Sequence, residues 1–181
     1  MINNDTESKV AGKMHAQKLV IYHPTAAGTG AALQLEPRVN RQEADRYNCF
    51  FMEMATQKTA ASRADGKRIP ASFDWEHKLT VKLDFTDICE MVAVLEGRMD
   101  KLGGTKSGLF HQNGNSSTVI TLQKADKGGY YVGLSKKTGE AGAVARVSMS
   151  LSEAEAIGLR SIFQAGLFFI TFHTHIFPTA A

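Results

Sequence analysis

Basic and aromatic side chains lie close together along several short segments of this sequence. Phe73 and Trp75 precede Lys78 and Lys82, and Lys124 precedes the adjacent Tyr130 and Tyr131. Unpaired nucleic-acid bases stack on aromatic rings and phosphates need cations, so a sheet that carries both suits a single nucleic-acid strand. The candidate binding residues are Phe73, Trp75, Lys78, Lys82, Lys106, Phe110, His111, Lys124, Tyr130, Tyr131 and Lys136.

The same aromatic residues also fit a place in the hydrophobic core, with the lysines keeping the surface soluble. Successive residues of a strand point to opposite faces, so only one of Tyr130 and Tyr131 is expected at the surface. Trp75 fits either role. Phe50, Phe85 and Phe163 are expected in the core.

Candidates for catalysis or metal binding are weaker. The pair His173 and His175 would share one face of a strand, but a metal site needs further ligands. Asp74 and Glu76 flank Trp75 and would also share a face, which allows a hydrolytic carboxylate pair. The glycine pair around Thr29 precedes no predicted helix, so it is a poor phosphate loop. We therefore expect a non-catalytic protein without a bound metal or cofactor.

The positive charge of the chain is concentrated in one segment. The formal net charge is only +3, from 21 Lys and Arg against 18 Asp and Glu. Residues 101–149 hold seven of these cations and two of the acids, which gives this segment a net charge of +5. Charge clustered on one face is typical of a protein that binds a polyanion, although an ordinary solvated sheet face has the same composition.

The hydrophobic pattern predicts an α+β protein in which four strands and a helix occur twice in succession. Residues 78–85 alternate strictly, whereas Ile88, Met91, Val92 and Leu95 follow a helical period after a cap at Thr86. A capping box at Ser150–Glu153 starts the second helix, over about 151–169. Short connections favour antiparallel pairing over a Rossmann or TIM architecture. Strands are expected at 18–23, 31–35 (ended by Pro37), 47–54, 78–85, 106–111, 118–124, 130–135 and 143–149.

The chain is long enough for one domain, which we place at residues 17–172 between a flexible arm (1–16) and a tail (173–181). Residues 56–71 are expected to form a long loop. Cys49 and Cys89 are expected to be buried reduced thiols. The first residues lack a secretory signal and no apolar run reaches the length of a membrane span, so we expect a cytoplasmic protein.

Several motifs resemble the Whirly family, in the same order along the chain. Residues 73–83 resemble its Tyr-Asp-Trp-Glu-Arg-Lys strand, and 109–111 resemble the Phe-Phe-His that follows its first helix. Residues 129–135 resemble its Gly-Tyr-Phe-Ile-Asn-Leu-Ser strand, and 147–163 its second helix. Residues 31–37 resemble the strand that carries its Lys-Gly-Lys-Ala-Ala-Leu motif, but Gly28-Thr29-Gly30 stands where that motif has Lys-Gly-Lys.

The resemblance implies two four-stranded antiparallel sheets packed crosswise, with a helix after each sheet. It also implies a homotetramer that binds single-stranded DNA with little sequence preference, while relatives of the same fold bind guide RNA. The apolar composition of residues 168–177 independently favours a homo-oligomer. The two lysines of the family's Lys-Gly-Lys motif are missing from this sequence, and the basic residues of 56–71 are candidates to replace their charge. The absence of an organelle transit peptide suggests a bacterial, phage or plasmid origin.

From these observations we expect a sequence-tolerant single-stranded DNA-binding protein of DNA replication, recombination, repair or transcription. The alternative is an RNA-binding or annealing protein, or a transcription coactivator, of the same fold.

Overall fold

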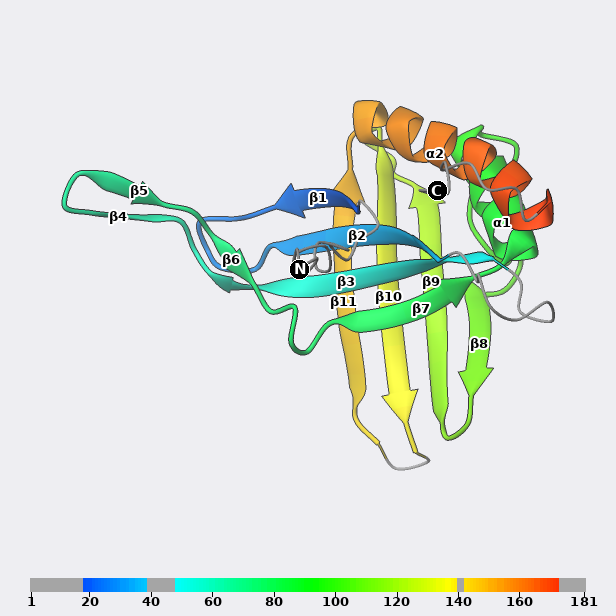
Figure 1. Ribbon diagram of the computed structural model, residues 1–181, viewed down its shortest axis with the longest axis horizontal. Helices are drawn as coiled ribbons and strands as arrows, with labels where there is room; N and C mark the ends of the chain where they lie inside the picture. The colour runs from blue at the N-terminus through cyan, green and yellow to red at the C-terminus, as the bar shows by residue number, and fades with distance from the viewer. Residues whose placement is uncertain (1–17, 39–47, 140–141, 173–181) are drawn as a thin grey trace, which may run out of the picture.

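A computed structural model of the chain describes residues 18–38, 48–139 and 142–172 (Figure 1). The predicted N-terminal arm and C-terminal tail, with His173 and His175, lie outside the described residues. In the described part, no helix has the length and apolar character needed to span a membrane.

The first sheet contains five strands, all paired antiparallel, in the order β1-β2-β3-β6, with β7 also paired to β3. β6 and β7 occupy successive positions along the same edge of β3, so the sheet is four strands wide. This differs in detail from the four-stranded sheet that was expected. The strands are β1 (Leu19–His23), β2 (Ala31–Arg38), β3 (Cys49–Thr59), β6 (Ser72–Phe73) and β7 (Leu79–Leu83).

The second sheet has four antiparallel strands in the order β11-β10-β9-β8. Its strands cross those of the first sheet, as the resemblance predicted, and extend beyond β7 at one end (Figure 1). They are β8 (Leu109–Asn113), β9 (Ser116–Lys124), β10 (Tyr130–Thr138) and β11 (Val144–Leu151).

In the described residues, one helix follows the last strand of each sheet. α1 (Phe85–Leu95) follows β7, and α2 (Glu153–Phe172) follows β11 and packs against α1. One hydrophobic cluster joins both sheets and both helices, including Leu33, Met52, Met91 and Phe163. The Phe50 and Phe163 rings meet edge to face, with centroids 6.4 Å apart, which confirms their predicted place in the core.

Residues 56–71 were expected to form a loop, and this prediction was wrong. β3 continues to Thr59, and β4 (Ser62–Ala64) and β5 (Lys67–Ile69) then form a two-stranded ribbon that projects from the body (Figure 1). Asp65 and Gly66 connect the strands with positive φ angles of 52° and 74°, as a type I′ hairpin turn requires. We call residues 60–71 the β4–β5 arm.

The helix starts also differ from expectation. Asp84, not Thr86, caps α1: its side chain accepts from the amide of Asp87, and the Asp87 carboxylate accepts from the amide of Asp84. The capping box of α2 lies two residues later than predicted, between Ser152 and Glu155. In both cases the apolar period placed the helix correctly, but more than one nearby side chain could serve as the cap.

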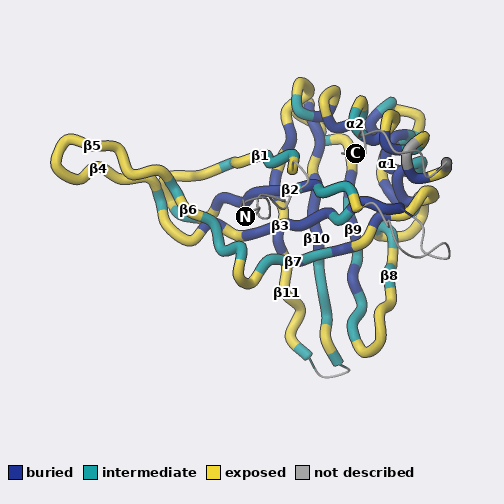
Figure 2. Tube along the Cα trace, viewed as in Figure 1, coloured by how far each residue is buried: buried dark blue, intermediate teal, exposed yellow. Residues whose placement is uncertain are grey.

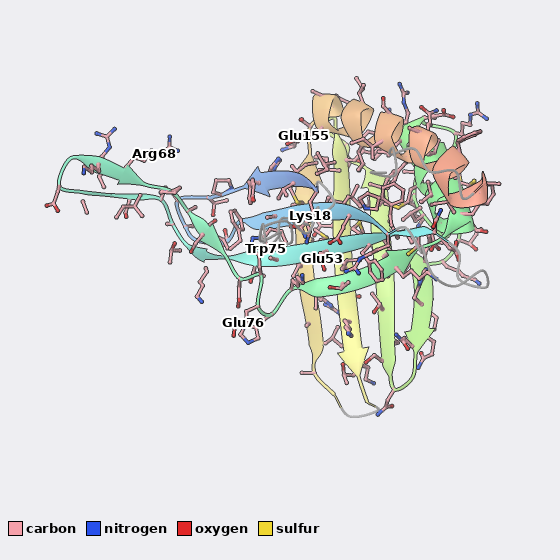
Figure 3. All side chains as sticks on the ribbon, in the orientation of Figure 1. Lys18, Glu53, Arg68, Trp75, Glu76 and Glu155 are labelled. Atoms are coloured by element: carbon pink, nitrogen blue, oxygen red, sulfur yellow. The ribbon has the colours of Figure 1, made fainter. Side chains whose placement is uncertain are left out.

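Four further expectations need correction. Pro37 lies inside β2 and does not end it. At Pro37, β2 is paired with β3 on one side, and the pairing with β1 on the other side has already ended. The strand predicted from residue 78 begins at Leu79. Asp74 and Glu76 lie between β6 and β7 and not on a strand, and Figure 3 labels Glu76 on this connection. Phe85 is 49% exposed rather than buried, because it opens α1 beside the sheet edge. Both cysteines are free; Cys49 is buried and Cys89 is partly buried.

Candidate functional site

The outer face of the second sheet is the surface that best combines aromatic and basic side chains. Alternation places Val132, Leu134, Val147 and Met149 in the core, so the residues between them point outward. Phe110 is 65% exposed and Tyr131 is 40% exposed on this side, which shows that no helix covers them. We use the term outer face for Phe110, Gln112, Ser117, Val119, Thr121, Gln123, Tyr131, Gly133, Ser135, Lys137, Val144, Arg146, Ser148 and Ser150.

Strand register aligns one cation and one ring across the whole outer face. Arg146 pairs with Ser135, Ser135 with Val119, and Val119 with Phe110, so these four residues form a row across β11, β10, β9 and β8. Tyr131 lies near the start of β10, four residues before Ser135. Its hydroxyl donates a 2.5 Å hydrogen bond to Ser148 Oγ. The ring is thereby held on the sheet surface, with its position fixed before any ligand binds.

The electrostatics of this sheet favour an anion. None of its four strands contains an Asp or Glu, while Lys124, Lys136, Lys137 and Arg146 lie on them. No ion pair is formed by these cations within the described residues. Cations without neighbouring carboxylates give a positive local potential, which attracts phosphate groups.

The outer side of the first sheet is different, because it carries carboxylates that pair with two of its lysines. Lys18 lies 2.8 Å from Glu36, and Lys78 lies 2.8 Å from Glu53. The hydrogen bond from Lys18 holds the pKa of Glu36 below its ordinary value, despite partial burial. Lys18 and Glu53 both lie on this sheet in Figure 3. The predicted binding residue Lys78 therefore already has an anionic partner in its own chain.

The other candidates near the first sheet are partly exposed. Phe73 is half-buried and packs against Tyr22, with ring centroids 5.3 Å apart. Trp75 is also half-buried, on the connection between β6 and β7 (Figure 3). Lys82 is exposed and lines a groove of about 440 Å³ between the β7–α1 junction and the end of α2. These residues do not lie on the outer face of the second sheet.

Two of the predicted binding residues, Tyr130 and His111, point toward the interior of the protein. Tyr130 is 6% exposed, and its hydroxyl donates to the backbone carbonyl of Leu95 at 3.2 Å. The ring belongs to the core, so Tyr130, although predicted as a binding residue, presents no face for stacking in this structure. His111 is half-buried with Nε2 3.0 Å from an Asp87 carboxylate oxygen, which ties β8 to α1. Burial raises the pKa of Asp87, and the histidine contact opposes that shift.

The remaining lysines lie at the margins of the second sheet. Lys106 is exposed in the loop before β8, and Lys124 is exposed at the end of β9. Lys136 is half-buried near the far end of β10, where Figure 2 shows the strands becoming intermediate and exposed in burial. Phe110 and Tyr131 are therefore the only members of the predicted set that lie on the outer face itself.

Lys137 and Arg146 are the outer-face residues that sequence reasoning missed. Both belong to the basic segment 101–149, but a charge count does not show which face a lysine occupies. The signal that could have found them is the alternation along each strand: Arg146 precedes the buried Val147, and Lys137 has the parity of Tyr131.

The carboxylates around Trp75 do not form a buried catalytic pair. Asp74 accepts from the backbone amide of His77 and contacts its Nδ1 at 2.9 Å, and these contacts keep the pKa of Asp74 below its ordinary value. Ligand atoms of Asp74, Glu76 and His77 lie within 4.8 Å of one another. Glu76 and His77 are exposed, and such clusters are common on surfaces without a metal.

Comparison with solved structures identifies the fold. The chain is similar to WHY1 of Arabidopsis thaliana, with 20% identity, 88% of each chain covered and a TM-score of 0.65. It is also similar to WHY3 of the same plant, with 19% identity over 88% of this chain and 90% of the other, and a TM-score of 0.67. The fold is Whirly-like. No protein-family model matches the sequence, and comparison with curated proteins finds no match.

A second kind of solved structure has a similar fold. A guide-RNA-binding protein complex bound to a guide RNA is also similar, with a TM-score of 0.56 and 15% identity over 88% of this chain and 94% of the other. At these identities the likeness concerns the fold. The Whirly structures come from a plant and give no support to the expected bacterial, phage or plasmid origin.

Proposed function

We propose that this protein binds single-stranded nucleic acid, with DNA as the first candidate, on the outer face of the second sheet and without catalysis. The observation that carries the proposal is a sheet face free of carboxylates that presents Phe110 and Tyr131 on the same side as Arg146 and Lys137. Rings stack on any base and cations contact any phosphate, so little sequence preference is expected.

The Whirly-like fold supports this proposal, because the family that the sequence resembles binds single-stranded DNA. RNA is the second candidate, since one structurally similar complex holds a guide RNA. We place the protein in DNA replication, recombination, repair or transcription, with RNA annealing or transcription coactivation as the alternative. Each of these processes exposes single strands.

Titration of an unstructured DNA oligonucleotide, the RNA of the same sequence and the corresponding duplex tests the proposal. The single strand should bind more tightly than the duplex, because only unpaired bases can stack on Phe110 and Tyr131. Stronger binding of RNA than of DNA would favour the second candidate. Equal or tighter binding of the duplex would contradict the proposal.

We further propose that the protein is a homo-oligomer, with a tetramer favoured by the Whirly resemblance. α2 presents Ile157 and Phe168, each 56% exposed, on the same side of the helix because they lie eleven residues apart, close to three turns. Exposed apolar side chains in such a row are typical of an interface. Light scattering of the purified protein should give four times the chain mass, and Ile157→Glu should lower it.

A further inference from the structure

We propose that the β4–β5 arm is a second nucleic-acid contact, which binds the phosphates of a double-helical segment beside the single strand. This inference rests on the proposed function but concerns a different part of the molecule. The arm projects from the first sheet, on the opposite side of the body from α1 (Figure 1). Its ribbon therefore reaches beyond the sheet that is proposed to hold the single strand.

The arm has no structural role that explains its sequence. Every residue from 61 to 70 is exposed, including Ile69 at 47%. β4 and β5 pair only with each other. The ribbon thus adds no side chain to the hydrophobic core. A short hairpin that contributes nothing to the core needs another reason for its composition.

Charge points to an anionic partner. Residues 58–71 hold Lys58, Arg63, Lys67 and Arg68 against a single acid, Asp65, so this short segment matches the net charge of the entire chain. In the described structure, Arg63, Lys67 and Arg68 form no ion pair. Figure 3 shows Arg68 on the arm, away from the body.

The strand register places two of these positive charges opposite each other, which destabilises the hairpin when no anion is bound. Arg63 and Arg68 are directly opposite in the ribbon, so their side chains leave from the same face. Like charges at such a cross-strand pair destabilise the hairpin. A phosphate between or beside the two guanidinium groups would remove the repulsion, and arginine is suited to phosphate by its planar set of donors.

The absence of rings distinguishes the arm from the outer face. Residues 58–72 contain no Phe, Tyr, Trp or His, so bases have nothing to stack on. Single-strand sites combine cations with stacking platforms, whereas contact with a double helix requires only cations that reach the backbone. A two-stranded ribbon also has the width that the major groove of B-DNA accepts. These features favour a duplex over a single strand as the ligand of the arm.

The test compares two DNA probes: an unstructured single strand, and the same strand joined to a hairpin duplex. The wild type should bind the tailed duplex more tightly than the bare strand. Arg63→Gln/Arg68→Gln should abolish this preference and leave binding of the bare strand unchanged. Two duplex phosphate contacts correspond to about 1.8 in the slope of log affinity against log salt, so the slope for the tailed duplex should fall by about that amount.

Two matched variants separate local contact from bulk charge and from misfolding. Lys106→Gln/Lys127→Gln removes the same charge from two exposed loops next to the second sheet, where neither lysine forms an ion pair within the described residues, and should retain the preference for the tailed duplex. Arg63→Lys/Arg68→Lys keeps the charge and should retain most of the preference. Circular dichroism and melting should be nearly unchanged in the arm variants, because the arm does not contribute to the core.

Three results would overturn the inference. The Gln variant could bind both probes as the wild type does, or lose affinity equally for both, which would place the arm in the single-strand site. A lower mass by light scattering would instead make the arm a contact between copies of the chain. These outcomes differ from failure of the proposed function, in which the wild type does not bind the bare strand.

Discussion

Tyr130 and Tyr131 are consecutive residues of β10, yet they lie on opposite faces of the sheet and make different contacts. Tyr130 is buried, and its hydroxyl donates to the carbonyl of Leu95, the last residue of α1. Tyr131 is 40% exposed, and its hydroxyl donates to Ser148 Oγ on β11. The first ring joins the second sheet to a helix, and the second is available to a ligand.

The two tyrosines should therefore separate stability from binding. Tyr131→Ala should weaken oligonucleotide binding by about 1–3 kcal/mol, which is roughly fivefold to a hundredfold, and cost no more than about 1 kcal/mol of stability, because its hydrogen bond to Ser148 is exposed. Tyr130→Phe should cost about 1 kcal/mol of stability through the lost hydrogen bond and leave affinity unchanged. Fluorescence anisotropy and urea unfolding measure the two effects. A binding loss in Tyr130→Phe larger than in Tyr131→Ala would contradict this assignment.

The cations of the outer face should determine the salt dependence. Arg146→Gln and Lys137→Gln should each lower the slope of log affinity against log salt by about 0.7, the value for one phosphate contact to a single strand. Lys78→Gln is the matched control, because Lys78 already pairs with Glu53 on the first sheet. If the salt-dependence slope changed more in Lys78→Gln than in the outer-face variants, the nucleic acid would bind on the first sheet instead.

The contact between α2 and the first sheet should be sensitive to a single methyl group. A Cβ at position 166 would lie 2.5 Å from a ring carbon of Phe50, whose ring is packed against Phe163. Gly166→Ala should therefore destabilise the protein by about 1–3 kcal/mol, although alanine favours helices. Gly158→Ala is the control, since nothing lies within 4 Å of the added carbon, and it should stabilise by up to about 1 kcal/mol. The same sign for both substitutions in chemical unfolding would refute the packing argument.

Acid should weaken the contact between β1 and α2. Burial alone would raise the pKa of Glu155, but hydrogen bonds from His23, at 2.7 Å, and from Ser152 lower it below its ordinary value of 4.5. The folded state thus binds fewer protons than the unfolded state, so this stabilisation is present above pH 4.5 and is lost as the pH falls through the lowered pKa.

Glu155→Gln tests this linkage, because a glutamine does not titrate. The variant should be less stable than the wild type at neutral pH, and the difference should shrink below pH 4.5. Urea unfolding at several pH values gives both curves. Parallel curves for the two proteins would show that Glu155 contributes no acid-dependent stability. Figure 3 places Glu155 at the start of α2, where its charge also favours the helix.

Periodicity was enough to predict most elements of this fold. Leu79, Val81 and Leu83 alternate with polar residues, and the helical stripe from Ile88 to Leu95 follows directly, so the change from strand to helix is visible in the sequence. The β4–β5 arm was missed because its short strands bury nothing and so have no apolar period. The Asp65-Gly66 turn was the remaining signal, since this dipeptide favours two-residue hairpins.

The binding surface was harder to predict because it depends on register and on pairing partners. The alternation rule says that Tyr130 and Tyr131 diverge, but only the contact with Leu95 shows which one is buried. Lys78 looks like a free cation until the pairing of β3 with β7 brings Glu53 beside it. Arg146 can be assigned to the same face as Phe110 only from the pairing of β8, β9, β10 and β11.

The central claim is that single-stranded nucleic acid binds on the outer face of the second sheet. Photo-crosslinking tests this location most directly. A single-stranded oligonucleotide that carries a photoreactive pyrimidine should crosslink to peptides of β8 and β10, at Phe110 and Tyr131, because bases stack on these rings. Phe110→Ala/Tyr131→Ala should abolish these crosslinks and weaken binding. Crosslinks confined to the first sheet, around Tyr22, Phe73 and Trp75, would contradict the claim.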